Sequence, residues 1–288
     1  SFGWREDRQL LDEAAELAAK ADIAIVSIGF NESLERESND RPFTLPEYQD
    51  SLVCRVLDAN PNTAVLVNAG SNADLSRWQE RTPALVYLWY PGQEGGTAAA
   101  EILFGKVNPS GKLPVTFEKR WEDNPAYPFY YDEDSDKRVS YGEGLLVGYR
   151  HYDTKGVQPN FAFGYGKSYT TFRFSGLKVK NESAKGKPLY KVSFDVTNTG
   201  TRDGKEVAQV YVRPIDAKVF RPYKELKGYD KKMIKAGQTV RFEISLDSEA
   251  FSYYKTDRHA FGYDAGEYEI LVGDASDNIL LRKTVKIK

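Results

Sequence analysis

The sequence predicts two regions of different fold class: an α/β layer, followed by an all-β sandwich. Over roughly the first hundred residues, segments with helical apolar spacing alternate with near-continuous apolar runs, which is typical of helices packed on a largely parallel sheet. From about Thr170 the apolar residues recur at every second position, which indicates strands with one face in a core. A length of 288 residues fits about two domains of ordinary size.

The elements of the first layer follow from these two kinds of spacing. Helical spacing predicts helices over residues 10–20, 46–60 and 97–104. Near-continuous apolar runs, which fit strands buried on both faces, occupy residues 22–29, 64–68 and 84–89. The sheet is small and the chain opens on a helix, so we expect the opening strands of this layer to be missing from the sequence.

An irregular arm and a set of alternating strands make up the remainder. Residues from about 119 to 166 are rich in Tyr, Asp, Pro and Gly, and a loop of this length is usually functional or packs across a domain boundary. Strands with alternating faces are then expected over 172–179, 189–198, 206–213, 224–230, 239–246, 267–273 and 279–287. This number of short strands is typical of immunoglobulin or fibronectin type III sandwiches. We therefore expect one domain over 1–166, including the arm, and a sandwich over 167–288.

The composition excludes several classes of function. Forty basic residues against 42 acidic ones give a net charge of −2, without the basic excess that a nucleic-acid or anionic-membrane surface requires. No apolar run approaches the ~20 residues of a membrane helix. Cys54 is the only cysteine, which excludes an internal disulfide and a thiolate cluster. His151 and His259 are too few for a histidine-rich metal site, so we expect neither a metal nor a cofactor.

Clustered carboxylates follow the first buried strand, where ligands tend to bind in open α/β sheets. Three glutamates lie within six residues of one another: Glu32, Glu35 and Glu37. Their like charges, partly offset by Arg36 and Arg41, tend to raise a carboxyl pKa, as a general acid requires near neutral pH. The alternative is a solvated charged loop, which is the commoner role of surface glutamates.

Several motifs then point to a family. Residues 35–41 read Glu-Arg-Glu-Ser-Asn-Asp-Arg, and Leu45-Pro46 follows as a helix start. Further motifs occupy residues 89–96, 104–114, 141–144, 148–153, 161–169, 224–228 and 265–268. Together, in this order and over nearly the whole chain, they resemble the carboxyl-terminal portion of family 3 glycoside hydrolases, chiefly bacterial β-glucosidases. The family's acid/base loop commonly reads Glu-x-Glu-Gly-x-Asp-Arg.

The resemblance implies roles for individual residues. Glu37 aligns with the family's general acid/base, and Glu35 aligns with the earlier acidic position and is the alternative. Asp40 and Arg41 match the closing pair of the loop, either as a local ion pair or as a direct sugar contact. Together with Glu35 they are the candidate substrate-binding residues. Ser38 stands where the family often has glycine. Serine has a narrower range of backbone angles, so the loop path and the choice between Glu37 and Glu35 stay open.

The resemblance also implies a mechanism and a missing partner. It implies a retaining double displacement whose nucleophile, an aspartate, lies on an amino-terminal (β/α)-barrel. Such a barrel needs about 250 residues and is not present in this sequence. We therefore expect this chain, inactive alone, to supply the acid/base to a barrel on the same or a separate polypeptide. The expected substrate is an oligosaccharide or an aryl β-glucoside.

Two further implications complete these expectations. A periplasmic or secreted location fits the family better than a cytoplasmic one. The alternative function is a noncatalytic module that binds carbohydrate or protein, and it has no need of clustered carboxylates. An unrelated flavodoxin-like domain would require a phosphate loop, which the sequence lacks.

Overall fold

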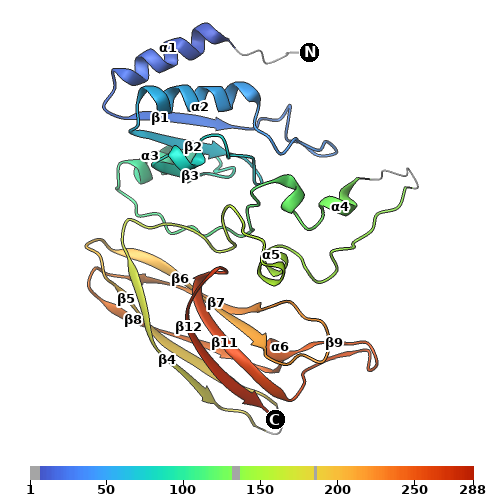
Figure 1. The fold of residues 1–288 in the computed structure, drawn as a ribbon. Coiled ribbons are helices and arrows are strands. Elements are labelled where there is room, and N and C mark those ends of the chain that lie inside the picture. The colour runs from blue at the N-terminus through green and yellow to red at the C-terminus, as the bar shows by residue number, and fades with distance from the viewer. Residues whose placement is uncertain (1–6, 132–136, 185–186) are drawn as a thin grey trace. The chain divides into compact units, whose positions relative to one another are not determined.

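The chain packs as two compact units. The computed structural model describes residues 7–131, 137–184 and 187–288, and positions 132–136 of the expected arm lie outside this part. The first unit runs to Phe104 and includes Lys119–Trp121, and the second takes Gly105–Glu118 and Glu122–Lys288 (Figure 1). A domain boundary at 166 stays a prediction.

The first unit is built on a small parallel sheet. Its strands lie in the order β1 (Ala24–Gly29), β2 (Thr63–Asn68) and β3 (Ala84–Tyr87), and both pairings are parallel. The central strand β2 is buried along almost its whole length, because neighbours cover both its edges and both its faces. A continuous apolar run therefore predicted it correctly.

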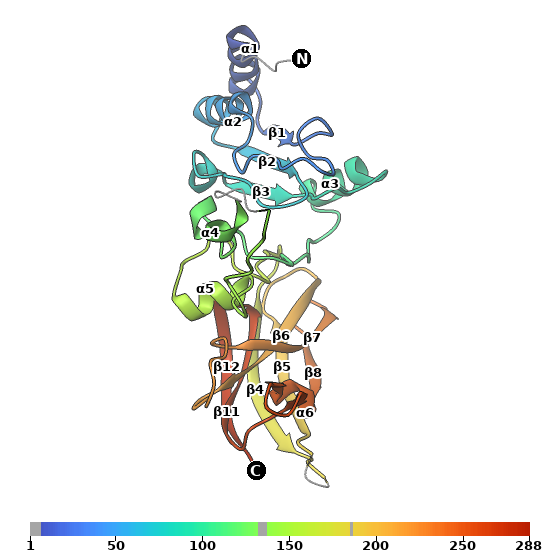
Figure 2. The same cartoon turned by 90° about the vertical axis from the view of Figure 1, so that its right-hand side faces the viewer.

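Helices cover this sheet. Helix α2 (Glu47–Ala59) contacts β1 and β2, and α1 (Arg8–Ala19) packs on α2 (Figure 1, Figure 2). The Asp7 side chain begins α1 by accepting the backbone N–H of Gln9 at 3.0 Å. Helix α3 (Gly95–Leu103) and a 3₁₀ turn, η1 (Gln79–Arg81), complete the unit. The predicted helices and strands are present, with ends shifted by at most two residues.

Hydrogen bonds to the backbone at the end of β1 fix the direction of the loop that follows. The Gln49 side chain accepts the Gly29 N–H at 2.9 Å and donates to the Gly29 carbonyl at 2.8 Å. Glycine is required here, because a Cβ on Gly29 would lie 2.0 Å from the Asn68 carbonyl oxygen. The Phe30 N–H donates to that same oxygen at 3.0 Å, so the loop after β1 starts against the end of β2.

The second unit contains a two-sheet β-sandwich. One sheet has the order β12-β11-β6-β7 and the other β4-β5-β8, with antiparallel pairing throughout. Its strands are β4 (Phe172–Asn181), β5 (Tyr190–Asn198), β6 (Gly204–Pro214), β7 (Glu225–Ile234), β8 (Thr239–Leu246), β11 (Gly266–Ala275) and β12 (Asn278–Ile287). These seven strands confirm the all-β prediction, with ends shifted by at most four residues.

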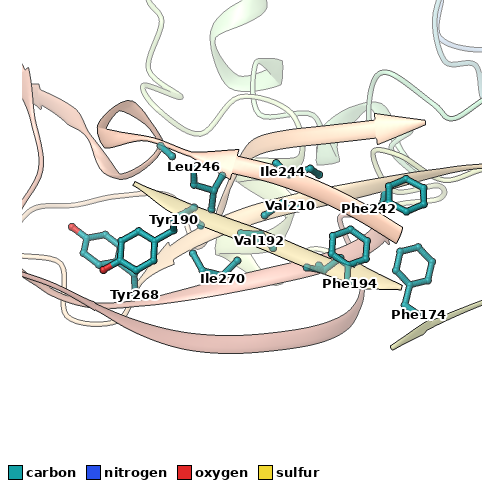
Figure 3. Close-up of a cluster of buried hydrophobic side chains, with 14 of the residues drawn as sticks. Phe174, Tyr190, Val192, Phe194, Val210, Phe242, Ile244, Leu246, Tyr268 and Ile270 are labelled. Atoms are coloured by element: carbon teal, nitrogen blue, oxygen red, sulfur yellow. The ribbon is translucent and has the colours of Figure 1, made fainter. Parts of the chain in front are cut away.

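Residues of both sheets form one core. Phe194 stacks between Phe174 and Phe242, with ring centroids 6.1 and 5.5 Å apart (Figure 3). Tyr268 and Ile270 come from the opposite sheet and are buried in the same cluster. A short helix, α6 (Ser248–Phe251), and a hairpin of β9 (Tyr253–Lys255) and β10 (Ala260–Gly262) lie between β8 and β11. These three elements are too short to produce a recognisable period in the sequence.

The arm packs on the sandwich within the second unit. It carries η2 (Trp121–Asp123), α4 (Tyr127–Tyr130) and α5 (Tyr149–Lys155), none of which its irregular sequence predicted. Asp153 forms a buried ion pair with Lys224 at 2.5 Å, and the Tyr149 hydroxyl accepts the Leu226 N–H at 2.7 Å. Lys112, on the segment before the arm, pairs with the buried Glu206 at 3.0 Å. Buried charges of this kind require their partners, so these contacts fix the arm to the sandwich.

Replacing Phe194 with alanine tests the sandwich core, because this ring is fully buried. We expect the free energy of unfolding of the second unit to fall by about 3–5 kcal/mol, since a cavity adds to the lost burial. Phe261→Ala is the matched control: its ring is 76% exposed, and we expect a change within about 0.5 kcal/mol. Urea unfolding followed by circular dichroism measures both, and equal losses would contradict this core.

Candidate active site at the carboxyl edge of the sheet

Three loops meet where the parallel strands end. Strands β1, β2 and β3 run in the same direction, so their carboxyl ends share one edge of the sheet. The loop after β1, which carries the clustered glutamates, extends beyond the arrowhead of that strand (Figure 1). Side chains and backbone groups that follow β2 and β3 contact this loop directly. This edge is where open α/β sheets usually bind ligands.

Glu35 is the residue that joins the three loops. Its carboxylate accepts the Gly70 N–H, with N–O distances of 3.2 and 3.3 Å, and the hydroxyl of Tyr90. Arg41 lies 3.4 Å away through its Nε atom, and the Glu35 side chain is 21% exposed. A Cβ on Gly70 would lie 2.6 Å from Glu35 Oε1, so glycine permits this close approach. All three partners donate, and Glu35 therefore serves as an acceptor that holds the loop.

Arg41 also supports this loop. Its side chain is 9% exposed, and its guanidinium lies over the Phe30 ring, 4.2 Å from the centroid. It donates to the Asn72 carbonyl at 2.6 Å and to the Ser71 hydroxyl. The planar, always charged guanidinium is suited to several fixed acceptors of this kind. Arg41 thus ties the loop after β1 to the segment after β2.

The structure does not bring Asp40 into this network. Asp40 is exposed, and within the described part of the chain no ion pair joins it to Arg41. Arg41 pairs with Glu35 instead of forming the closing pair that the sequence offered as one alternative. A role of Asp40 or Arg41 in contacting sugar stays a prediction.

Glu37 occupies the tip of a tight turn two residues beyond Glu35. Arg36 and Asn39 bridge across the turn, which leaves Glu37 and Ser38 as its two central residues. The Asn39 side chain donates to the Leu34 carbonyl at 3.4 Å and closes the base of the turn. Glu37 is exposed, and among the described residues its carboxyl has no hydrogen bond or ion pair. The turn therefore presents an accessible carboxyl group on a fixed base.

The backbone of Ser38 shows which path the loop takes at this position. Its φ is 58°, in the left-handed region that favours glycine. The chain thus follows, with serine, the kind of path for which glycine is the usual residue. The departure from the Glu-x-Glu-Gly pattern therefore leaves the turn intact, with Glu37 at its tip.

Sequence reasoning missed the partners contributed by the other two loops. Nothing in the local sequence marks Gly70 or Ser71, and Tyr87 and Tyr90 stand out only as parts of the expected strand over 84–89 and of the motif over 89–96. The Tyr87 hydroxyl donates to the Ser71 carbonyl, as that of Tyr90 does to Glu35. The available signal was positional: both short segments lie at or just after the carboxyl ends of parallel strands, where functional residues gather.

The described residues include no arrangement suited to a metal. No group of three or more His, Cys, Asp or Glu side chains is placed to hold an ion within this part of the chain. No helix in the same part is long and apolar enough to cross a membrane.

Ser38→Gly tests the conformation of the turn. The left-handed region costs a serine about 1–2 kcal/mol, more than the ~0.5–1 kcal/mol of extra entropy that glycine loses on folding. We expect the free energy of unfolding of the first unit to rise by about 0.5–1 kcal/mol. The control Ser76→Gly, at an exposed turn residue without a positive φ, should lower it instead. Denaturant unfolding distinguishes these results, and destabilisation by both variants would contradict the turn.

Comparison with known proteins gives a consistent assignment for nearly the whole chain. Residues 6–169 match the glycosyl hydrolase family 3 C-terminal domain, and residues 206–276 match a fibronectin type III-like domain. The thermostable β-glucosidase B of Acetivibrio thermocellus is 38% identical over 282 residues, which make up 98% of this chain and 37% of that protein. The chain thus spans about a third of the length of the curated relatives it matches.

Solved structures agree with this result. A family 3 β-glucosidase of Bifidobacterium adolescentis superposes with a TM-score of 0.94 at 37% identity, covering 99% of this chain and 42% of that one. The β-glucosidase of Kluyveromyces marxianus in complex with glucose gives 0.92 at 39% identity, covering 99% and 34%. Because the first family match alone covers more than half of its residues, this chain belongs to glycoside hydrolase family 3, as its C-terminal domain followed by a fibronectin type III-like domain.

Proposed function

We propose that this chain forms the acid/base half of a retaining β-glucosidase and that Glu37 is its general acid/base. The observation that carries the proposal is the contrast between two neighbouring carboxyl groups. Glu37 is accessible at the tip of its turn, whereas Glu35 accepts from three donors at the base of the loop. A group that must give a proton to a substrate needs the first environment.

Glu35 is poorly placed for that task. To protonate a leaving group it would have to exchange at least one of its donors, Gly70, Tyr90 or Arg41, for the substrate oxygen. Loss of Glu35 as a partner would leave the buried guanidinium of Arg41 without a carboxylate, which is a costly arrangement. These contacts support a holding role for Glu35 and leave proton transfer to Glu37.

The proposed reaction proceeds in two displacements. A barrel carboxylate attacks the anomeric carbon, the bond from that carbon to the leaving oxygen breaks, and the Glu37 carboxyl gives its proton to that oxygen. The Glu37 carboxylate then takes a proton from water as the water oxygen attacks the anomeric carbon and releases the nucleophile. Both carboxyl groups thereby return to their starting states. Because the nucleophile attacks the sugar directly, the two carboxyl groups of a retaining site lie about 5–5.5 Å apart.

Terminal β-linked glucose is the proposed substrate. The relatives are named β-glucosidases, and four of the similar solved structures are complexes with glucose. The nucleophile is expected on an amino-terminal barrel, on the same or a separate polypeptide, and this chain alone is proposed to be inactive. Alkyl and aryl β-glucosides therefore serve as test substrates only when a family 3 barrel domain is supplied.

The dependence of the rate on the leaving group tests Glu37 directly. In this chain combined with a barrel domain, Glu37→Gln should lower kcat/KM for an alkyl β-glucoside by about 10²–10⁴-fold, because the alkoxide requires a proton. For 2,4-dinitrophenyl β-glucoside kcat/KM should change only a few-fold, since that leaving group departs without one. Steady-state kinetics on both substrates provides the comparison, with the chain lacking its barrel as the blank.

Two further variants make this experiment decisive. Glu32→Gln alters an exposed glutamate of the same loop and should leave both substrates unaffected. Glu35→Gln identifies the alternative donor. If Glu35→Gln shows the leaving-group selectivity and Glu37→Gln does not, the assignment is reversed. If neither variant shows it, the noncatalytic module becomes the better account.

A further inference from the structure

The residues that hold Glu35 form a closed circuit across the carboxyl edge of the sheet. We call this circuit the brace: Glu35, Arg41, Ser71, Tyr87 and Tyr90. Glu35 contacts Arg41 and Tyr90, Arg41 donates to the Ser71 hydroxyl, and the Ser71 carbonyl accepts from Tyr87. The chain from residue 87 to 90 joins the two tyrosines. The brace therefore links two residues of the loop after β1 and one residue of the loop after β2 to both tyrosines at the end of β3.

Backbone strain lies inside the brace. Trp89 has a φ of 56°, in a region that bulky side chains rarely adopt. Its ring packs edge-on against that of Tyr87, with centroids 5.3 Å apart. The turn at Trp89 lets two tyrosines only three residues apart reach different acceptors, Ser71 for one and Glu35 for the other. Such strain persists where the surrounding contacts determine it, and it is concentrated at functional sites.

Tyr90 is not a core residue. Its side chain is 57% exposed, so the ring contributes little apolar burial. The hydroxyl is the part of the residue that contacts the loop, through a hydrogen bond to a carboxylate, which is among the stronger kinds. Partial desolvation of the hydroxyl, and then its bond to Glu35, raise the pKa of Tyr90 to about 12. The hydroxyl therefore remains protonated and able to donate at neutral pH.

We infer that Tyr90 is a positioning residue for proton transfer: its hydroxyl holds Glu35, and Glu35 fixes the base of the turn that carries Glu37. This inference rests on the proposed role of Glu37. The path is short, because Glu35 directly precedes Arg36, which bridges to Asn39 across the turn. Small displacements of a catalytic group have large effects, since a misplacement of 1 Å can lower a rate by about 10²-fold.

Tyr90→Phe removes the hydroxyl and keeps the ring. In the chain combined with its barrel domain, we expect kcat/KM for an alkyl β-glucoside to fall by about 10–100-fold, because the proton donor is less well placed. For 2,4-dinitrophenyl β-glucoside kcat/KM should stay within a few-fold of the parent value. Tyr229→Phe is the matched control: this strand residue of the sandwich is 70% exposed and should affect neither substrate.

A double-mutant cycle identifies the route of the effect. If Tyr90 acts through Glu35, the losses of Tyr90→Phe and Glu35→Gln on the alkyl substrate should not multiply in the double variant. If Tyr90→Phe folds poorly, Glu35→Gln still tests the same hydrogen bond, because it removes the charge of the acceptor. Rates are normalised to titrated active sites, so that a loss of folded protein does not imitate a loss of rate.

The outcomes separate this inference from the function on which it rests. Selective loss on the alkyl substrate with Tyr90→Phe, together with non-additivity, supports the inference. Equal losses on both substrates, no loss, or fully multiplicative losses overturn it while a selective Glu37→Gln effect keeps the proposed function. If Glu37→Gln shows no selectivity, the proposed function fails and the inference fails with it.

Discussion

The pairing of Glu35 with the buried guanidinium of Arg41 is the constraint on which the candidate site depends. Removing Arg41 from water is costly unless its donors are satisfied, and Glu35 is the carboxylate that pairs with it. The same guanidinium also reaches Ser71 and Asn72, beyond the end of β2. Once this pair forms, the base of the loop after β1 is fixed. The position of the turn that carries Glu37 is then fixed as well.

This arrangement divides the work between two glutamates in almost the same sequence position. Glu35 holds the loop by accepting hydrogen bonds, and Glu37 keeps an accessible carboxyl. In the proposed function, local environment rather than residue type sets their roles, as in other sites where paired carboxyl groups differ in function. The strained backbone at Trp89 and the left-handed turn at Ser38 belong to the same edge of the sheet, where strain commonly accompanies function.

Much of this molecule could be predicted from sequence, for identifiable reasons. The apolar run of β2 and the alternation of β5 reflect burial on two faces and on one, so each strand carried its own signal. The loop with Glu35 and Glu37 was found from its charge cluster and its motif. The brace could not be found in this way, because Tyr90 lies 55 residues from Glu35 and local sequence does not encode such a contact.

Several of the motifs outside that loop make contacts within the second unit. Lys112 pairs with Glu206, and Asp153 with Lys224, so three of the motif segments contact one another or the sandwich. The Asn108 side chain accepts the N–H of Tyr169 at 2.8 Å and joins the motif over residues 104–114 to one further motif, residues 161–169. These contacts hold the arm and the segment before it on the sandwich.

The stereochemistry of azide rescue tests the central assignment most directly. Glu37→Ala, combined with a barrel domain and supplied with 2,4-dinitrophenyl β-glucoside, should accumulate a glycosyl-enzyme that water attacks slowly. Azide needs no general base and enters from the face that the missing carboxylate vacates. If Glu37 is the acid/base, azide accelerates turnover and the product is β-glucosyl azide, with retained configuration. An α-glucosyl azide, or the absence of any acceleration, would contradict this assignment.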